Sequence, residues 1–133
     1  MADKKEELCL YRMKRAKETL QVAMECYDNK HYMDAMNRSY YAAFYAVKAV
    51  LALEETDFKR HKDVIAYFNK IYVASGKIER DLGRNLGRLQ QKREKSDYDD
   101  FYVVSADEAK EQVCFVTKLL ECIENTFVKT SDF

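Results

Sequence analysis

The chain of 133 residues contains no proline and only three glycines, which all lie in the short stretch 76–87. Proline and glycine interrupt helices and form many of the tight turns that connect strands. Their scarcity therefore predicts long helices joined by short turns and argues against a sheet of many strands. At this length the chain is most simply one domain, residues 1–133, and it can bury a hydrophobic core.

Long apolar runs are also missing, since no uninterrupted apolar segment is long enough to cross a bilayer. Residues 1–7 lead into an amphipathic pattern and not into the apolar segment of a signal peptide. From these two features we expect a cytoplasmic protein with no membrane partner.

Cysteine motifs are absent as well. The four cysteines, Cys9, Cys26, Cys114 and Cys122, include no C-x-x-C pair, and all but Cys26 fall on or beside predicted apolar stripes. This pattern favours reduced core thiols over a disulfide framework or a zinc site. The chain also has no P-loop, dinucleotide-binding glycine pattern, nucleophile elbow or metal-ligand set, so we expect no metal and no cofactor.

Neither sign of charge is in excess, because Lys plus Arg and Asp plus Glu each number 23. A neutral chain has no global field that attracts nucleic acid or membrane. The charge is uneven, however, with residues 77–95 mainly basic and residues 96–133 mainly acidic. The basic stretch contains a ridge of Arg80, Arg84, Arg88 and Lys92, spaced four residues apart. Such a ridge is either a track for nucleic-acid phosphates or a solvated helix face paired with the acidic final part.

Apolar residues at intervals of three and four predict five helical segments, over about residues 5–28, 31–53, 58–74, 78–95 and 106–128. Asp57 is the expected N-cap of the third segment, and Ser105 opens a capping box for the last. Asn29 can take the left-handed backbone of the first turn, and Ser75-Gly76 should end the third segment. The predicted fold class is all-α, an antiparallel up-and-down bundle of four to five helices.

The second segment is the most informative part of the chain. Residues 38–51 (RSYYAAFYAVKAVL) combine an arginine and three tyrosines with a ridge of alanines. Small side chains let a neighbouring helix approach closely, which predicts a central position for this segment. The tyrosines Tyr40, Tyr41 and Tyr45 either fill the core or stack on nucleic-acid bases.

His61 is expected near the start of the third segment, among Lys59, Arg60 and Lys62. Surrounding cations disfavour the protonated form of an imidazole. His61 is therefore either a base for catalysis or an ordinary surface or capping residue.

Three motifs occur in a characteristic order: RSYYAAF at residues 38–44, HKDV at 61–64, and Arg93 followed by SDYD at 96–99. Together with the Glu108-Ala109 pair that opens the last segment, they resemble a HEPN domain. The resemblance covers about residues 8–127 and is to the small bacterial and archaeal group often paired with minimal nucleotidyltransferases. It implies a helical bundle, also described as the nucleotidyltransferase substrate-binding fold, and commonly a homodimer.

Many HEPN proteins are metal-independent ribonucleases, and toxins or defence effectors. Their signature is an arginine followed a few residues later by a histidine, facing a cleft at the dimer interface. Here Arg93 matches the arginine by position, and Tyr98 stands where the histidine is expected. A tyrosine, whose reference pKa is near 10, accepts a proton poorly at neutral pH, whereas a histidine near 6.5 does so readily.

From this resemblance we expect a cleft that binds a phosphate group. The expected lining residues are Arg38, Tyr41, His61, Arg93, Asp97 and Tyr98. Arg93 and Arg38 would bind the phosphate while Asp97 orients a guanidinium group. The alternative is that these groups form a network of ion pairs and hydrogen bonds that joins the helices.

Three functions are consistent with the sequence. The first is a binding module without catalysis, a homodimer that partners a minimal nucleotidyltransferase in a toxin–antitoxin or stress-response pair and binds a nucleotide or RNA phosphate. The second is a variant metal-independent ribonuclease that uses Arg93 with His61 or Tyr98. The third is a tetratricopeptide-like interaction bundle, suggested by the pattern of residues 32–43.

Overall fold

The computed structural model describes residues 3–128, so residues 1–2 and 129–133 of the expected domain lie outside the described part. Within residues 3–128 the chain forms five α-helices and no strand. They are α1 (Lys4–Asp28), α2 (Tyr32–Leu53), α3 (His61–Phe68), α4 (Arg80–Tyr98) and α5 (Ala106–Ile123). The helix α3 continues into a π-helical turn, η1 (Asn69–Val73), and α5 into η2 (Glu124–Val128). The predicted all-α class is confirmed.

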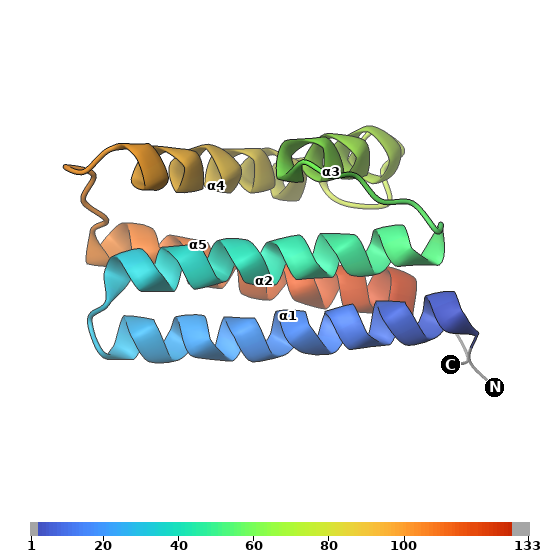
Figure 1. Ribbon diagram of the computed structural model, residues 1–133, viewed down its shortest axis with the longest axis horizontal. Coiled ribbons are helices and arrows are strands. Elements are labelled where there is room, and N and C mark those ends of the chain that lie inside the picture. Colours follow the sequence, from blue (N-terminus) through green and yellow to red (C-terminus); the bar gives the residue numbers. More distant parts are fainter. Residues whose placement is uncertain (1–2, 129–133) are drawn as a thin grey trace.

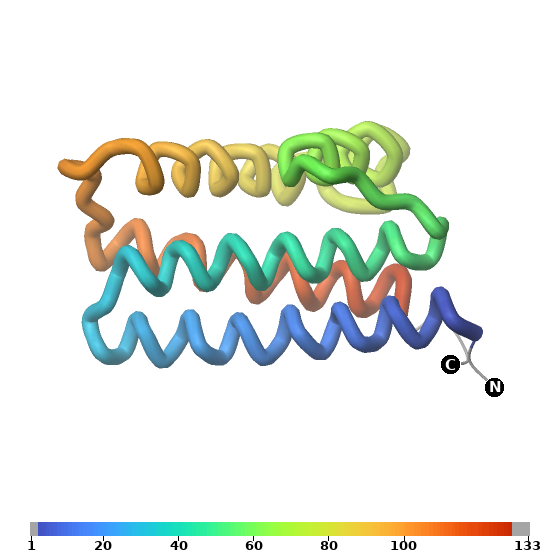
Figure 2. Tube along the Cα trace, viewed as in Figure 1, coloured from blue at the N-terminus to red at the C-terminus, as the bar shows by residue number. Residues whose placement is uncertain are grey.

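The four long helices alternate in direction along the chain, as Figure 1 shows. The helix α2 lies between α1 on one side and α3 with α4 on the other. The Cα trace shows α5 running beside α1 and α2, behind both in this view (Figure 2). None of the helices in the described range is both long and apolar enough to cross a membrane.

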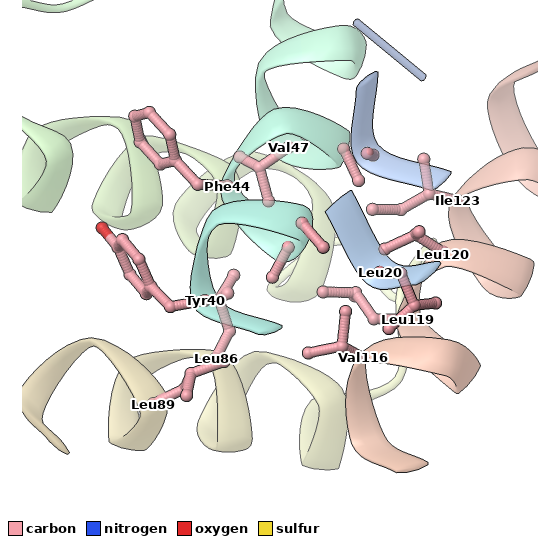
Figure 3. Close-up of a cluster of buried hydrophobic side chains, with 14 of the residues drawn as sticks. Leu20, Tyr40, Phe44, Val47, Leu86, Leu89, Val116, Leu119, Leu120 and Ile123 are labelled. Atoms are coloured by element: carbon pink, nitrogen blue, oxygen red, sulfur yellow. The ribbon is translucent and has the colours of Figure 1, made fainter. Parts of the chain in front are cut away.

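The central position predicted for α2 is confirmed by burial. Its alanines Ala42, Ala46 and Ala49 are fully buried, because helices contact α2 from several sides. The large buried side chains lie on two sides of α2 (Figure 3). Leu20, Leu119 and Ile123 form one side, while the rings of Tyr40 and Phe44 point away from them. This second side is where the polar residues gather.

Two turns differ from the sequence-based expectation. In the first turn Lys30, and not Asn29, takes the left-handed backbone, with φ of 65° against −90° for Asn29. The third helix begins at His61 with Arg60 as N-cap, so Asp57 is not the N-cap. The Asp57 carboxylate accepts the Phe58 backbone N–H and pairs with the Lys48 ammonium at 3.4 Å. These contacts hold residues 54–60 as a loop that connects α2 to α3.

The predicted ends of the other helices agree more closely. Gly76 has a φ of 85° after η1, which is the left-handed conformation expected where that segment stops. Ser105 caps α5 by accepting the Glu108 backbone N–H at 3.1 Å. The helix α4 extends to Tyr98, beyond the predicted end at about residue 95.

Among the cysteines Cys9 is buried, but Cys114 is exposed and is therefore no core thiol.

Candidate functional site

Polar and aromatic side chains from three helices meet on the side of α2 that faces α3 and α4. The helix α2 contributes Tyr40 and Tyr41, one after the other in its sequence. His61 is the first residue of α3, and Arg93 lies in the second half of α4. These residues are therefore far apart in the chain and are brought together by the packing of α3 and α4 onto α2.

Arg93 is at the centre of this group. Its Nη2 donates a hydrogen bond to the Tyr41 hydroxyl at 2.9 Å. Its guanidinium carbon lies 5.2 Å from the centroid of the Tyr40 ring and 5.5 Å from that of Tyr41. The Asp97 carboxylate, one helical turn further along α4, approaches the Arg93 Nε to 3.3 Å. Arg93 is therefore held on two sides, by a carboxylate and by two aromatic rings.

His61 is held by aromatic contacts. Its Nδ1 lies 3.1 Å from the Tyr40 hydroxyl, and its ring stacks on Phe44 with the centroids 3.9 Å apart. Two tautomers satisfy this hydrogen bond. Either the Tyr40 hydroxyl donates to Nδ1, or a protonated Nδ1 donates to the Tyr40 oxygen and leaves a lone pair on Nε2. In both cases Nε2 is the nitrogen left for a ligand.

The surroundings of His61 and Tyr40 keep these two side chains uncharged. Burial lowers the pKa of His61, and the positive charges of Arg93 and Lys48 lower it further. The sequence suggested that Lys59, Arg60 and Lys62 disfavour protonation of His61. In the structure its pKa is lowered by burial and by Arg93 and Lys48 instead. Burial also raises the pKa of Tyr40 to about 12, despite the opposing effect of Arg93. At neutral pH both groups are therefore neutral.

Arg38 contacts one of the rings that Arg93 contacts. The Arg38 guanidinium carbon lies 5.0 Å from the centroid of the Tyr41 ring, which Arg93 also contacts. Two arginines thus share one tyrosine. We call Arg38, Tyr40, Tyr41, His61, Arg93 and Asp97 the polar cluster.

Tyr98 does not join the polar cluster. Its side chain is 89% exposed and lines a separate surface hollow with Gln91, Glu94 and Lys95. The reason is helical geometry, because five residues along an α-helix amount to about 140° of rotation away from Arg93. Asp97, four residues along, is rotated by only about 40° and stays on the Arg93 side.

A surface cavity of about 450 Å³ opens beside the polar cluster. Its lining residues are Arg60, His61, Lys62, Gln90, Arg93 and Glu94. Four of the six are basic or imidazole groups, and Arg60 is engaged with Asp63 at 2.9 Å. The cavity thus combines a guanidinium group with a neutral imidazole, which suits an anionic ligand.

The basic ridge predicted on α4 is present in part. Arg80, Arg84 and Arg88 are exposed, and Arg84 lies 3.7 Å from Asp81 on its own helix. Lys92 is only partly exposed and lies 4.0 Å from Glu108 of α5. Only the Lys92–Glu108 pair matches the interpretation of a face paired with the acidic final part, because Asp81 belongs to α4 itself. The exposed arginines are also compatible with a phosphate track.

The lining residues expected from the sequence do not include Tyr40 and Phe44. Both belong to the central helix α2, and they hold the His61 imidazole. The available signal was their spacing of four residues, which places both rings on one face of α2. Among residues 3–128, no three or more histidine, cysteine or acidic side chains gather closely enough to hold a metal ion.

Comparison with known proteins adds the family. A protein of Thermotoga maritima named "UPF0332 protein" is 32% identical over 92% of this chain and 92% of its own length. Two proteins of Methanocaldococcus jannaschii carry the name "putative toxin". One is 39% identical over 62% of either chain, and the other is 28% identical over 74% of this chain and 67% of its own.

The model of one family, the HEPN domain, matches residues 10–126. The match includes all six residues of the polar cluster and the helices that position them. With the helical bundle, this match shows that the chain belongs to the HEPN domain family.

Proposed function

We propose that this HEPN domain is a binding module of a toxin–antitoxin or stress-response pair and that its polar cluster binds a phosphate group of a nucleotide or RNA. The observation that supports this most directly is the approach of Arg38 and Arg93 to one ring, Tyr41. Two guanidinium groups that contact one ring can bind a doubly charged phosphate between them, and each supplies several N–H donors. The names of two relatives support the toxin context.

The proposed partners are a second copy of the chain and a minimal nucleotidyltransferase. The homodimer is supported by the apolar side chains that α4 and the following loop expose. Tyr98 is 89%, Phe101 91% and Val103 80% exposed. Large exposed apolar groups close together are typical of interaction sites. Stable copurification with a nucleotidyltransferase encoded beside this gene would support the second partner, and the absence of such a gene would count against it.

A binding experiment tests the phosphate site. Titration calorimetry with AMP and with inorganic phosphate should show Arg93→Ala binding about tenfold or more weakly than wild type, because charge-assisted hydrogen bonds are lost. Arg84→Ala on the ridge is the matched control. If Arg84→Ala weakens binding and Arg93→Ala does not, the phosphate site lies on the ridge and this proposal is wrong.

The second candidate is the variant ribonuclease, which one observation favours. His61, with its lowered pKa, lines the same cavity as Arg93. A neutral imidazole can take the proton from a ribose 2′-hydroxyl while a guanidinium stabilises the charge that develops on the phosphate. Tyr98 is not required for such a site. The tetratricopeptide-like alternative is not proposed further, because residues 32–43 fall within the matched HEPN model.

RNA incubated with the purified protein in the presence of a metal chelator separates these two candidates. Cleavage by wild type that is lost in both His61→Gln and Arg93→Ala would favour the ribonuclease. Intact RNA would favour the binding module. Tyr98→His should not create activity, because residue 98 is turned about 140° around α4 from Arg93 and does not line the cavity that Arg93 and His61 line.

A further inference from the structure

A row of two tyrosines flanked by two cations runs along one face of α2. Arg38, Tyr41, Tyr45 and Lys48 follow one another at intervals of three, four and three residues. This spacing keeps them on one face of the helix over about 15 Å. Arg38 is exposed and the other three are partly exposed, so all four can reach a ligand.

The far half of this row has its own arginine, supplied by α1. The Arg15 guanidinium carbon lies 5.3 Å from the centroid of the Tyr45 ring. The Arg15 Nη2 also donates to the Tyr45 hydroxyl at 3.3 Å. Tyr45 and Arg15 thus repeat, one helical turn further along α2, the arrangement of Tyr41 with Arg93.

Each acidic group near this second pair already interacts with a cation, and Asp57 does so with Lys48 of the row itself. Glu18, three residues after Arg15, lies 4.0 Å from the Lys14 ammonium. Asp57 lies 3.4 Å from Lys48 and 3.9 Å from Arg12. Arg15 itself is exposed, with Tyr45 as its bonded neighbour. Its positive charge therefore faces solvent beside an aromatic ring.

We propose that Tyr45 and Arg15 form a second nucleotide subsite, so that the row on α2 binds a single-stranded nucleic acid across Tyr41 and Tyr45. This inference rests on the proposed phosphate site at Arg93 and extends it from one nucleotide to a strand. Bases stack on tyrosine rings and on guanidinium planes, while arginines neutralise the phosphates between them. Such stacking tolerates any base, so the strand is recognised without regard to its sequence.

The arrangement favours a nucleic acid over a protein segment as the occupant. Two cations flank two tyrosine rings along one face of α2, and Arg38 and Tyr41 of that face belong to the polar cluster. A protein partner anchors mainly through buried apolar contacts, whereas this row consists of charged groups and phenols.

Fluorescence anisotropy with end-labelled oligouridylate of about ten nucleotides tests the second subsite. Tyr45→Ala and Arg15→Ala should each weaken binding of this strand about five- to hundredfold, the loss expected for one stacked base. Both should leave the affinity for AMP, measured by calorimetry, unchanged. Tyr45→Phe, which keeps the ring, should retain most of the strand affinity. An oligodeoxyuridylate arm shows whether the site distinguishes RNA from DNA.

Matched controls lie outside the row. Tyr32→Ala removes a partly buried tyrosine at the start of α2, and Lys118→Ala removes an exposed cation of α5. Neither should change binding of the strand. Thermal unfolding of every variant identifies any that lose affinity because they do not fold. If an alanine variant does not fold, Tyr45→Phe and Arg15→Lys replace the two alanine variants. Arg15→Lys is expected to bind the strand more weakly than wild type.

The outcomes separate this inference from the phosphate proposal. Loss of strand binding in Arg93→Ala but not in Tyr45→Ala or Arg15→Ala would overturn the second subsite and leave the phosphate site standing. Loss of strand binding in Tyr45→Ala and Arg15→Ala, but not in Arg93→Ala, would overturn the phosphate site at Arg93 and leave the subsite at Tyr45 and Arg15 standing. If wild type binds neither AMP nor either strand, both proposals are wrong. Binding of a protein that depends on Tyr45 would then show that the row is a protein-interaction surface.

Discussion

His61 shows how a single residue acquires its properties from residues distant in the chain. Its ring is bonded to Tyr40, stacked on Phe44 and exposed to the field of Arg93 and Lys48. The two cations disfavour a positive charge on the imidazole, and the two aromatic side chains supply no negative charge to balance it. The neighbours Lys59, Arg60 and Lys62, which the sequence makes conspicuous, contribute less than the packing does.

The lowered pKa of His61 predicts a specific dependence of stability on pH. In the unfolded chain His61 takes up a proton near pH 6.5, whereas the folded protein resists this until lower pH. The unfolded state then binds more protons, so stability falls as the pH drops below about 6.5. Urea unfolding between pH 7.5 and 5.5 should show a smaller loss of stability for His61→Gln than for wild type. Equal losses would contradict the assignment.

At the scale of elements, two glycines of α4 have opposite environments. A Cβ added at Gly83 would lie 2.8 Å and 2.9 Å from the two methyl groups of Val73 and 3.0 Å from Asn69 Oδ1. The helix can therefore lie against η1 only because residue 83 has no side chain. Gly87, one turn later, has no atom within 4 Å of such a Cβ among the described residues.

This contrast predicts opposite effects of the same substitution. Gly83→Ala should lower the free energy of unfolding by about 1–3 kcal/mol, because the stiff valine cannot move aside without strain. Gly87→Ala should raise it by roughly 0.5–1 kcal/mol, because alanine restricts the unfolded chain and favours helix. Urea unfolding of the two variants measures both. A stabilised Gly83→Ala variant would show that η1 moves away from α4 easily.

For the whole molecule, α4 and the loop after it are the surface proposed to meet a partner, because they expose Tyr98, Phe101 and Val103. The exposed arginines Arg80, Arg84 and Arg88 lie towards the start of α4, while the exposed Asp99 and Asp100 follow its end. Two copies that pair their α4 helices in antiparallel fashion would place these opposite charges face to face. The exposed apolar side chains near the end of α4 would then be covered.

The homodimer proposal predicts a measurable change in mass. Light scattering after size-exclusion chromatography should give twice the chain mass of 15.7 kDa for wild type. Phe101→Asp should shift the protein towards the monomer, because it places a charge in the apolar part of the interface. Val22→Asp on α1, also an exposed apolar position, serves as the control and should stay dimeric. A wild-type monomer would contradict the proposal.

The sequence by itself determined the helical class, the central place of α2 and most helix ends. These follow from local rules, namely the lack of proline, the periodicity of apolar residues, the capping residue Ser105 and the stop at Gly76. The same local rules missed Asp57, because its carboxylate is engaged by Lys48 and Arg12 from other helices.

Only the tertiary structure decided which polar residues meet. Arg38 and Arg93 share the ring of Tyr41 because α4 packs beside α2, and no spacing in the sequence encodes that approach. Tyr98 is excluded because helical rotation turns it away, although it lies only five residues from Arg93. The pairing of Arg15 with Tyr45 likewise depends on the contact between α1 and α2. Contacts between helices are long-range, so residue order alone does not specify them.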